Sequence, residues 1–292
     1  MVQLKKNNFV LTRLAPIFGM LALLAATGCA TSMSYSTYPQ PLEPGEVSGS
    51  VAGQLTLNSA IIDTTLNSLE IATDYAVDHN EELTEAEYRD LLDTLVTYAL
   101  FRPAVNPEVA MRVGVWDGID VGLRYNMSMY KGDAKVRVWE SDDKESVVSV
   151  SAGLGRAGGL GPSSLKYITW SEFSRLDLDV AVMYGHQPSE YFRVYGGPRM
   201  LHSWLTVEPV ISPELEAVIP EQYQQYRPEQ YFQDENILYL GGTAGLMVGY
   251  DWIWLHLEAT VMYTFFTPMI IDARRNLSGL TVAPVAGISV EF

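Results

Sequence analysis

The feature that most constrains the fold is a two-residue alternation of apolar and polar side chains, which recurs from Glu46 to the last residue. Successive side chains of a β-strand point to opposite faces, so each such segment predicts a strand with one apolar and one polar face. The alternation occurs in ten segments, which are 47–57, 109–115, 119–127, 134–138, 148–154, 176–184, 192–200, 238–250, 253–263 and 282–292. We therefore expect an all-β, antiparallel fold of about ten strands, with eight or twelve as alternatives, because 166–173 and 203–211 have ambiguous strand character.

The connections between these segments alternate in length. The short ones are 116–118, 141–145, 186–190 and 251–252, and the longer ones lie around 58–106, 156–173, 203–235 and 265–277, with 128–132 as a short exception. Taking Trp116-Asp117-Gly118 as a three-residue loop pairs Val115 with Ile119 and places Gly118 at the left-handed position. An even number of strands with alternating short and long connections is typical of an up-and-down transmembrane β-barrel.

A soluble barrel shows the same alternation with its apolar face inward, so other features must separate the two readings. Tyr125, Tyr184, Tyr250 and Tyr263 fall on the apolar face near strand ends, where membrane barrels carry aromatic girdles. The chain ends on Phe292, with apolar residues at alternate positions before it. In these respects residues 42–57 and 107–292 resemble bacterial outer-membrane β-barrel proteins. The resemblance implies that the barrel-assembly machinery reads Phe292, and it brings no catalytic motif.

The N-terminus has the pattern of a secretory signal. Lys5, Lys6 and Arg13 precede or open an apolar run that ends at Ala26, and no acidic residue occurs before Glu43. The sequence Ala-Ala-Thr-Gly-Cys at 25–29 resembles the bacterial lipoprotein cleavage box, with alanine where leucine is usual. The resemblance implies removal of residues 1–28, acylation of Cys29 and anchoring in outer-membrane lipid from the periplasmic side of a Gram-negative envelope. An ordinary signal peptide followed by an idle thiol is the alternative.

Two further segments complete the domain organisation. Residues 29–45 contain three prolines and no helical or strand period, so they predict an extended tether that leads to the barrel at 46–292. Residues 59–101 instead carry helical spacing, with a capping box that starts at Thr84 and a stop at Pro103. We expect a helical hairpin inserted between the first two strands, which either caps the barrel, plugs it, or docks on a partner.

Charged residues occupy the polar, inward face of the expected barrel. Seven are cations and four are anions, and one histidine lies among them: Arg112, Arg124, Lys135, Arg137, Arg175, Arg193 and Arg199, then Asp120, Asp177, Asp179 and Glu258, then His256. One interpretation is that these charges pair across strands, because an unpaired buried ion costs several kcal/mol. The other is that residual positive charge in a wet lumen favours small anionic solutes.

Catalysis has little support in the sequence. His256 and Glu258 share a face and are the best candidates for an acid–base couple, while Asp177 and Asp179 form a second pair on one face. No Gly-x-Ser-x-Gly, His-Glu-x-x-His or Walker motif occurs. A single cysteine without a Cys/His cluster predicts neither a metal site nor a cofactor.

Composition narrows the function further. A formal net charge of −16 repels phosphate backbones and excludes sequence-independent binding of nucleic acids. We expect a non-enzymatic outer-membrane β-barrel lipoprotein that forms a narrow passage for small solutes. The alternatives are a structural or surface-adhesive protein with a sealed lumen, supported by a Tyr/Gln-rich loop at 222–232, a lipid-anchored periplasmic β-barrel that binds a ligand, and a hydrolase at the barrel rim that uses His256 or His202.

Overall fold

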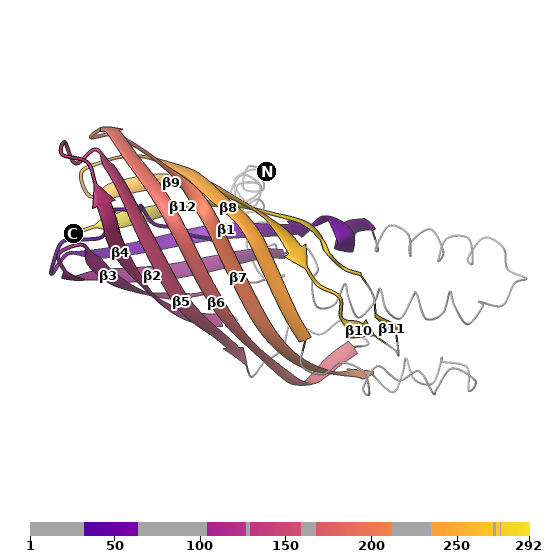
Figure 1. Ribbon diagram of the computed structural model, residues 1–292. Helices are drawn as coiled ribbons and strands as arrows, with labels where there is room; N and C mark the ends of the chain where they lie inside the picture. Colours follow the sequence, from indigo (N-terminus) through magenta and orange to yellow (C-terminus); the bar gives the residue numbers. More distant parts are fainter. Residues whose placement is uncertain are drawn as a thin grey trace, which may run out of the picture.

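Ten antiparallel strands close into a single barrel (Figure 1), in which each strand pairs with its neighbour in sequence and β1 pairs with β12. The computed structural model describes residues 32–63, 104–126, 129–158, 168–211, 235–270, 273–274 and 276–292. The barrel strands are β1 Val47–Asn58, β2 Ala104–Trp116, β3 Ile119–Tyr125, β4 Met129–Glu140, β5 Ser146–Gly158, β6 Ile168–Ser189, β7 Phe192–Ile211, β8 Glu235–Tyr250, β9 Ile253–Phe265 and β12 Gly279–Glu291. A separate pair, β10 Met269–Ile270 and β11 Ala273–Arg274, lies within the last long connection.

The expected all-β antiparallel barrel of ten strands is confirmed. Several strands are longer than the alternation predicted, and most of the added residues lie at the ends next to the long connections. Ile168 of β6 pairs with Ile211 of β7, so the ambiguous segments form one extended hairpin. Likewise β4 begins at Met129 rather than at residue 134, because Tyr125 of β3 pairs directly with Tyr130. Backbone pairing thus extends strands into regions where the alternation is weak.

The short turns gather at the end of the barrel where the C-terminus lies (Figure 1). Gly118 has a φ of 72°, which confirms the left-handed position in the β2–β3 turn. The predicted partner of Ile119 was wrong, since Trp116 takes the place expected for Val115. A register shift between Gly114 and Trp116 absorbs the extra residue, so the turn itself has two residues instead of three.

The barrel wall has its polarity inside out relative to a soluble core. Along β9 exposed and buried side chains alternate strictly; Leu255 and Leu257 are 53% and 48% exposed, whereas His256 and Glu258 are 1% and 5% exposed. The outward faces of the other strands likewise carry exposed valine, leucine, isoleucine and methionine. Aromatic side chains stand at both ends of this apolar surface, among them all four tyrosines expected to form girdles: Tyr125, Tyr184, Tyr250 and Tyr263.

Most of the predicted helical hairpin at 59–101 lies outside the described residues. The described part, residues 59–63, forms a short helical turn after β1. In the part of the chain that the structure describes, no helix has the length and apolar character needed to cross a membrane.

Candidate functional site

The N-terminal residues 32–42, which we call the luminal segment, run inside the barrel. Residues 32–36 and Tyr38 are at most 6% exposed. Below the segment, the Gly45 amide donates to the Gly114 carbonyl at 2.9 Å, beside the β2–β3 turn. The segment therefore enters by the mouth that carries the short turns and runs toward the long connections. Residues 32–45 are extended, as expected, but an external tether is wrong, because the polar inner wall binds this stretch.

Two acceptor side chains hold consecutive backbone amides of the luminal segment. Gln54 of β1 accepts hydrogen bonds from the amides of Met33 and Ser34, each at 2.8 Å. Glu258 of β9 accepts from the next two amides, those of residues 35–36, at 2.7 and 3.0 Å. Farther toward the rim, the Leu42 amide donates to Asp120 at 3.1 Å. Buried amides that face side chains in place of a strand ladder thus all find acceptors here.

Cationic side chains hold the carbonyl groups of the same segment. Arg124 Nη1 donates to the Ser34 carbonyl at 2.6 Å, and Arg199 donates to the carbonyls of Met33 and Ser34. Lys135 Nζ donates to the carbonyls at positions 38 and 40, at 2.7 and 3.2 Å. Hydrogen bonds from charged groups are the stronger kind. The backbone of the luminal segment is therefore bound from both its donor and its acceptor sides.

The lumen charges predicted from sequence are brought together, and among the described residues each of the seven cations has a carboxylate partner. The pairs are Arg112 with Asp120 and Asp133, Arg124 with Asp133, Lys135 with Asp120, Arg137 with Asp117 and Glu140, Arg175 with Asp177, Arg193 with Glu291, and Arg199 with Asp179. Pairing across and along strands is the arrangement expected of buried ions.

Sequence reasoning missed several members of this network. Lys131, which pairs with Asp179, and Asp133, which pairs with Arg112 and Arg124, were placed in or beside a turn at 128–132. Three further luminal or rim carboxylates were overlooked, namely Glu108, Glu140 and Glu291. One added cation and four added carboxylates remove the apparent excess of seven cations over four anions. Strand parity would have found Glu108 and Glu291, since both lie on inward positions.

The predicted acid–base couple is not formed. Glu258 is engaged by the luminal segment and by the Tyr195 hydroxyl, which donates to it at 2.8 Å. His256 is 1% exposed, and within the described residues neither ring nitrogen has a hydrogen-bond partner. A Cβ on Gly287, the neighbour of His256 on β12, would overlap the imidazole ring, so glycine makes room for it. The geometry gives His256 no proton-transfer partner.

The other catalytic candidates are also separated. Asp177 and Asp179 take different cations, so they do not share a proton. His202 stacks on Trp204 at 4.3 Å, away from the buried inward face of β7. A serine–histidine contact does occur at the short-turn rim, where Ser146 Oγ lies 3.0 Å from His186 Nδ1 and 3.1 Å from the Tyr184 hydroxyl. No described carboxylate donates orientation to that ring through a hydrogen bond, so no triad is present in these ranges.

Aromatic and cationic side chains close the mouth beside the short turns. The Arg193 guanidinium lies 3.8 Å from the Trp254 ring centroid and 5.0 Å from that of Tyr38, and it also bonds Glu291 at 2.9 Å. Such cation–π contacts gain strength where water is excluded. They fix the lower part of the luminal segment against β7, β9 and β12.

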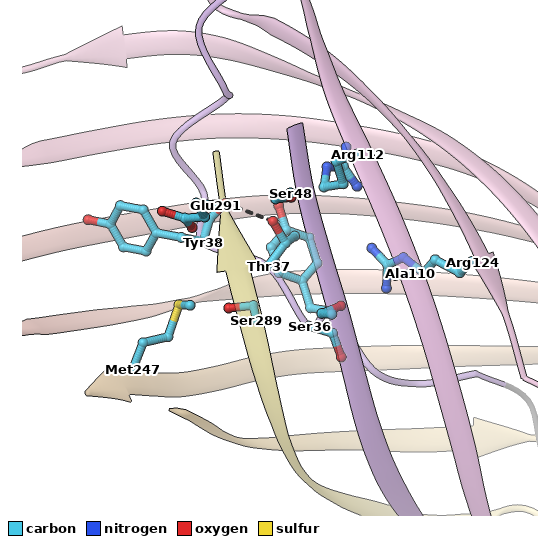
Figure 2. A pocket seen from close by; sticks show the side chains of 12 residues that line it. Ser36, Thr37, Tyr38, Ser48, Ala110, Arg112, Arg124, Met247, Ser289 and Glu291 are labelled. Carbon is cyan, nitrogen blue, oxygen red and sulfur yellow. Dashed lines mark hydrogen bonds between the residues drawn. The ribbon is translucent and has the colours of Figure 1, made fainter. Parts of the chain in front are cut away.

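A small hollow remains between the luminal segment and the wall. Figure 2 shows its lining, in which Ser36, Thr37 and Tyr38 face Ser48, Ala110, Arg112 and Arg124 of β1–β3 and Ser289 and Glu291 of β12. The enclosed room is about that of a single water molecule. The two arginines at its edge are already paired with carboxylates, so the hollow is not an open anion site.

Two predicted site residues lie at or beyond the limits of the described chain. Cys29 and the signal at 1–28 lie outside the described residues. Phe292 is 73% exposed, stacks on Trp252 at 6.0 Å between centroids, and exchanges two backbone hydrogen bonds of 2.8 Å with Val47.

Comparison with known proteins gives structural matches alone, because no family model and no curated protein sequence matches this chain. The translocator domain of the autotransporter NalP from Neisseria meningitidis is similar over 96% of this chain and 97% of its own, at 9% identity and a TM-score of 0.38. Neisserial surface protein A is similar over 85% of this chain and 96% of its own, at 10% identity and a TM-score of 0.33. The outer membrane protein OprG from Pseudomonas aeruginosa is similar over 87% of this chain and 98% of its own, at 11% identity and a TM-score of 0.32. At these values the similarity carries no information on what this chain binds.

Proposed function

We propose that this chain is a non-enzymatic outer-membrane β-barrel lipoprotein that is closed by its own luminal segment and holds its long loops at the cell surface. Its role on this proposal is structural or adhesive. The observation that carries it is the binding of residues 33–36 by Gln54, Glu258, Arg124 and Arg199 inside the lumen. Passage of small anions is disfavoured, because the cations that would attract them are already paired.

The inverted polarity of the wall supports placement in a bilayer. A periplasmic barrel would bury its apolar faces, whereas here Leu257 and its outward neighbours are exposed and Glu258 is buried. Membrane barrels carry an apolar outer band between aromatic girdles. Acylation of Cys29, its place on the periplasmic side, and recognition of Phe292 by the assembly machinery are part of this proposal and rest on the sequence.

The adhesive part of the proposal assigns binding to the long connections. The Tyr/Gln-rich loop at 222–232 and most of the expected helical hairpin lie outside the described residues. Tyrosine beside amides offers contact area together with adaptable hydrogen bonding. Deletion of 222–232 is expected to abolish adhesion while the barrel remains heat-modifiable on gels.

Conductance in planar bilayers tests whether the lumen is closed. We expect the full-length protein to give no steady conductance. In Ser36→Pro the ring cannot adopt the φ of 50° found at this position and removes the amide that Glu258 accepts, so the luminal segment is dislodged and conductance appears. Ser36→Gly tolerates this φ and keeps the amide, so it stays silent. Steady conductance of the unaltered protein would overturn the proposal.

A further inference from the structure

We propose that the lumen is a binding site for an extended polypeptide, recognised through its backbone, and that the luminal segment is a resident occupant that a separate peptide can replace. This inference rests on the proposed closure of the barrel and adds a ligand class to it.

The wall presents hydrogen-bonding groups at the spacing of a peptide backbone. Gln54 and Glu258 accept from four consecutive amides, those of residues 33–36, while Arg124 and Arg199 donate to carbonyls of the same stretch. These side chains come from β1, β3, β7 and β9, so they surround the segment and do not extend a sheet edge. A small anion offers no row of N–H donors for these acceptors, and an extended peptide offers both donors and acceptors.

The same groups require an occupant. Without the luminal segment, Glu258 would keep the Tyr195 hydroxyl as its hydrogen-bond donor among the described residues, although its side chain is 5% exposed. A buried carboxylate with so few donors is unfavourable. Arg199 would keep Asp179 but lose two carbonyl acceptors. The lumen therefore favours any chain that restores amides and carbonyls at these places.

Side-chain contacts add a sequence preference. Met33 belongs to a buried apolar cluster with Leu201, Ile237 and others. The Ser34 hydroxyl donates to Glu108 at 2.9 Å, and the Tyr35 ring lies 6.2 Å from that of Tyr195. The preferred ligand is thus an extended peptide with an apolar residue, a small hydroxyl residue and an aromatic residue in succession.

The resident is held in a way that permits exchange. Within the described residues 32–42, no backbone hydrogen bond joins the segment to a strand; the first such bonds are those of Gly45 and Glu46 with Gly114 at the rim. Its contacts with the wall are made by side chains, so departure breaks no sheet ladder. Ser36 also holds a left-handed φ of 50°, which is unfavourable for a residue other than glycine.

Peptide binding to full-length variants in detergent tests the proposal. The probe is a fluorescent synthetic peptide with the sequence of residues 32–42, and the proteins are Ser36→Pro and its control Ser36→Gly. We expect saturable binding to Ser36→Pro with an apparent affinity at least about tenfold higher than to Ser36→Gly or the unaltered protein, because the resident blocks the site in the latter two. A peptide methylated on the amide nitrogens of positions 34–36 should not bind.

A second measurement covers a Ser36→Pro chain that fails to become heat-modifiable. The unaltered protein is then exposed to excess peptide carrying a photoreactive group in place of Tyr35, and crosslinks are expected on β7 beside Tyr195. Binding of the methylated peptide as tightly as the plain one would overturn the inference, as would the absence of both binding and crosslinks. A silent bilayer in the same preparation would leave the closed-barrel proposal standing, so the two failures are distinguishable.

Discussion

Glu258 shows how one side chain couples the wall to the luminal segment. It accepts the amides of residues 35–36 and the Tyr195 hydroxyl, so three donors converge on one buried carboxylate. The sequence predicted that Glu258 faces the lumen, which strand parity determines. It did not predict the partners, because they come from a segment without a period and from a strand more than sixty positions away.

Glu258→Gln should weaken the folded state. An amide side chain has one acceptor oxygen and two N–H donors, so it cannot satisfy three converging donors. We expect a loss of about 1–3 kcal/mol in the free energy of unfolding, measured by denaturant titration of the detergent-solubilised barrel. Asp117→Asn is the control, since Asp117 pairs with Arg137 at an 86% exposed position and such pairs contribute little. Equal stability of Glu258→Gln and the unaltered protein would contradict this account.

Glycines on the inward face make room for large side chains. A Cβ on Gly245 would lie 2.5 Å from the hydroxyl oxygen of Tyr195, its partner across β7 and β8, whereas a Cβ on Gly53 would meet nothing within 4 Å. Gly245→Ala is therefore expected to displace Tyr195 from Glu258 and to cost roughly 1–3 kcal/mol. Gly53→Ala should leave the unfolding midpoint unchanged. A midpoint for Gly245→Ala that matches the Gly53→Ala control would show that the ring yields without cost.

At the scale of elements, the ten strands were predictable because period-two alternation and turn residues agree. Gly118 in the left-handed region and the two-residue turn at Asp251 both fall where the alternation breaks. The strand start at Met129 was missed because glycine and polar residues interrupt the alternation there. The luminal segment was missed for a different reason: its serines, threonine and prolines have a linker composition, and only the assembled wall supplies partners for them.

The outward face of β9 allows a test of membrane insertion. Leu257 lies in the middle of this strand and is 48% exposed. In a bilayer, Leu257→Arg should cost about 2–4 kcal/mol, as a drop in the folded fraction recovered in lipid vesicles, whereas Trp116→Arg at the strand end should cost about 1 kcal/mol or less. In a soluble barrel Leu257→Arg would be neutral or would improve solubility, and that result would refute the membrane placement.

At the scale of the whole molecule, the C-terminal residue allows assembly to be separated from stability. Phe292→Ala keeps the backbone hydrogen bonds with Val47 and removes a ring that is 73% exposed. We expect unchanged refolding of purified protein in detergent and a severalfold decrease of heat-modifiable protein in cells, because the assembly signal is lost. Trp252→Ala removes the stacking partner but keeps the signal. Equal loss in both variants would attribute the effect to the stacked pair.

The pairing of β1 with β12 has a kinetic consequence. Each of the other nine strand contacts in the barrel joins neighbours along the chain, whereas Ser48 and Glu291 are separated by nearly its whole length. Contacts of such long sequence separation form slowly, because most of the chain must be ordered first. Until this seam forms, the sheet is open along one side and the luminal segment, joined to β1 at Gly45–Glu46, can settle across it laterally. Once the seam has formed, the segment can enter or leave by the mouths alone, so the last step of folding also sets how quickly an occupant exchanges.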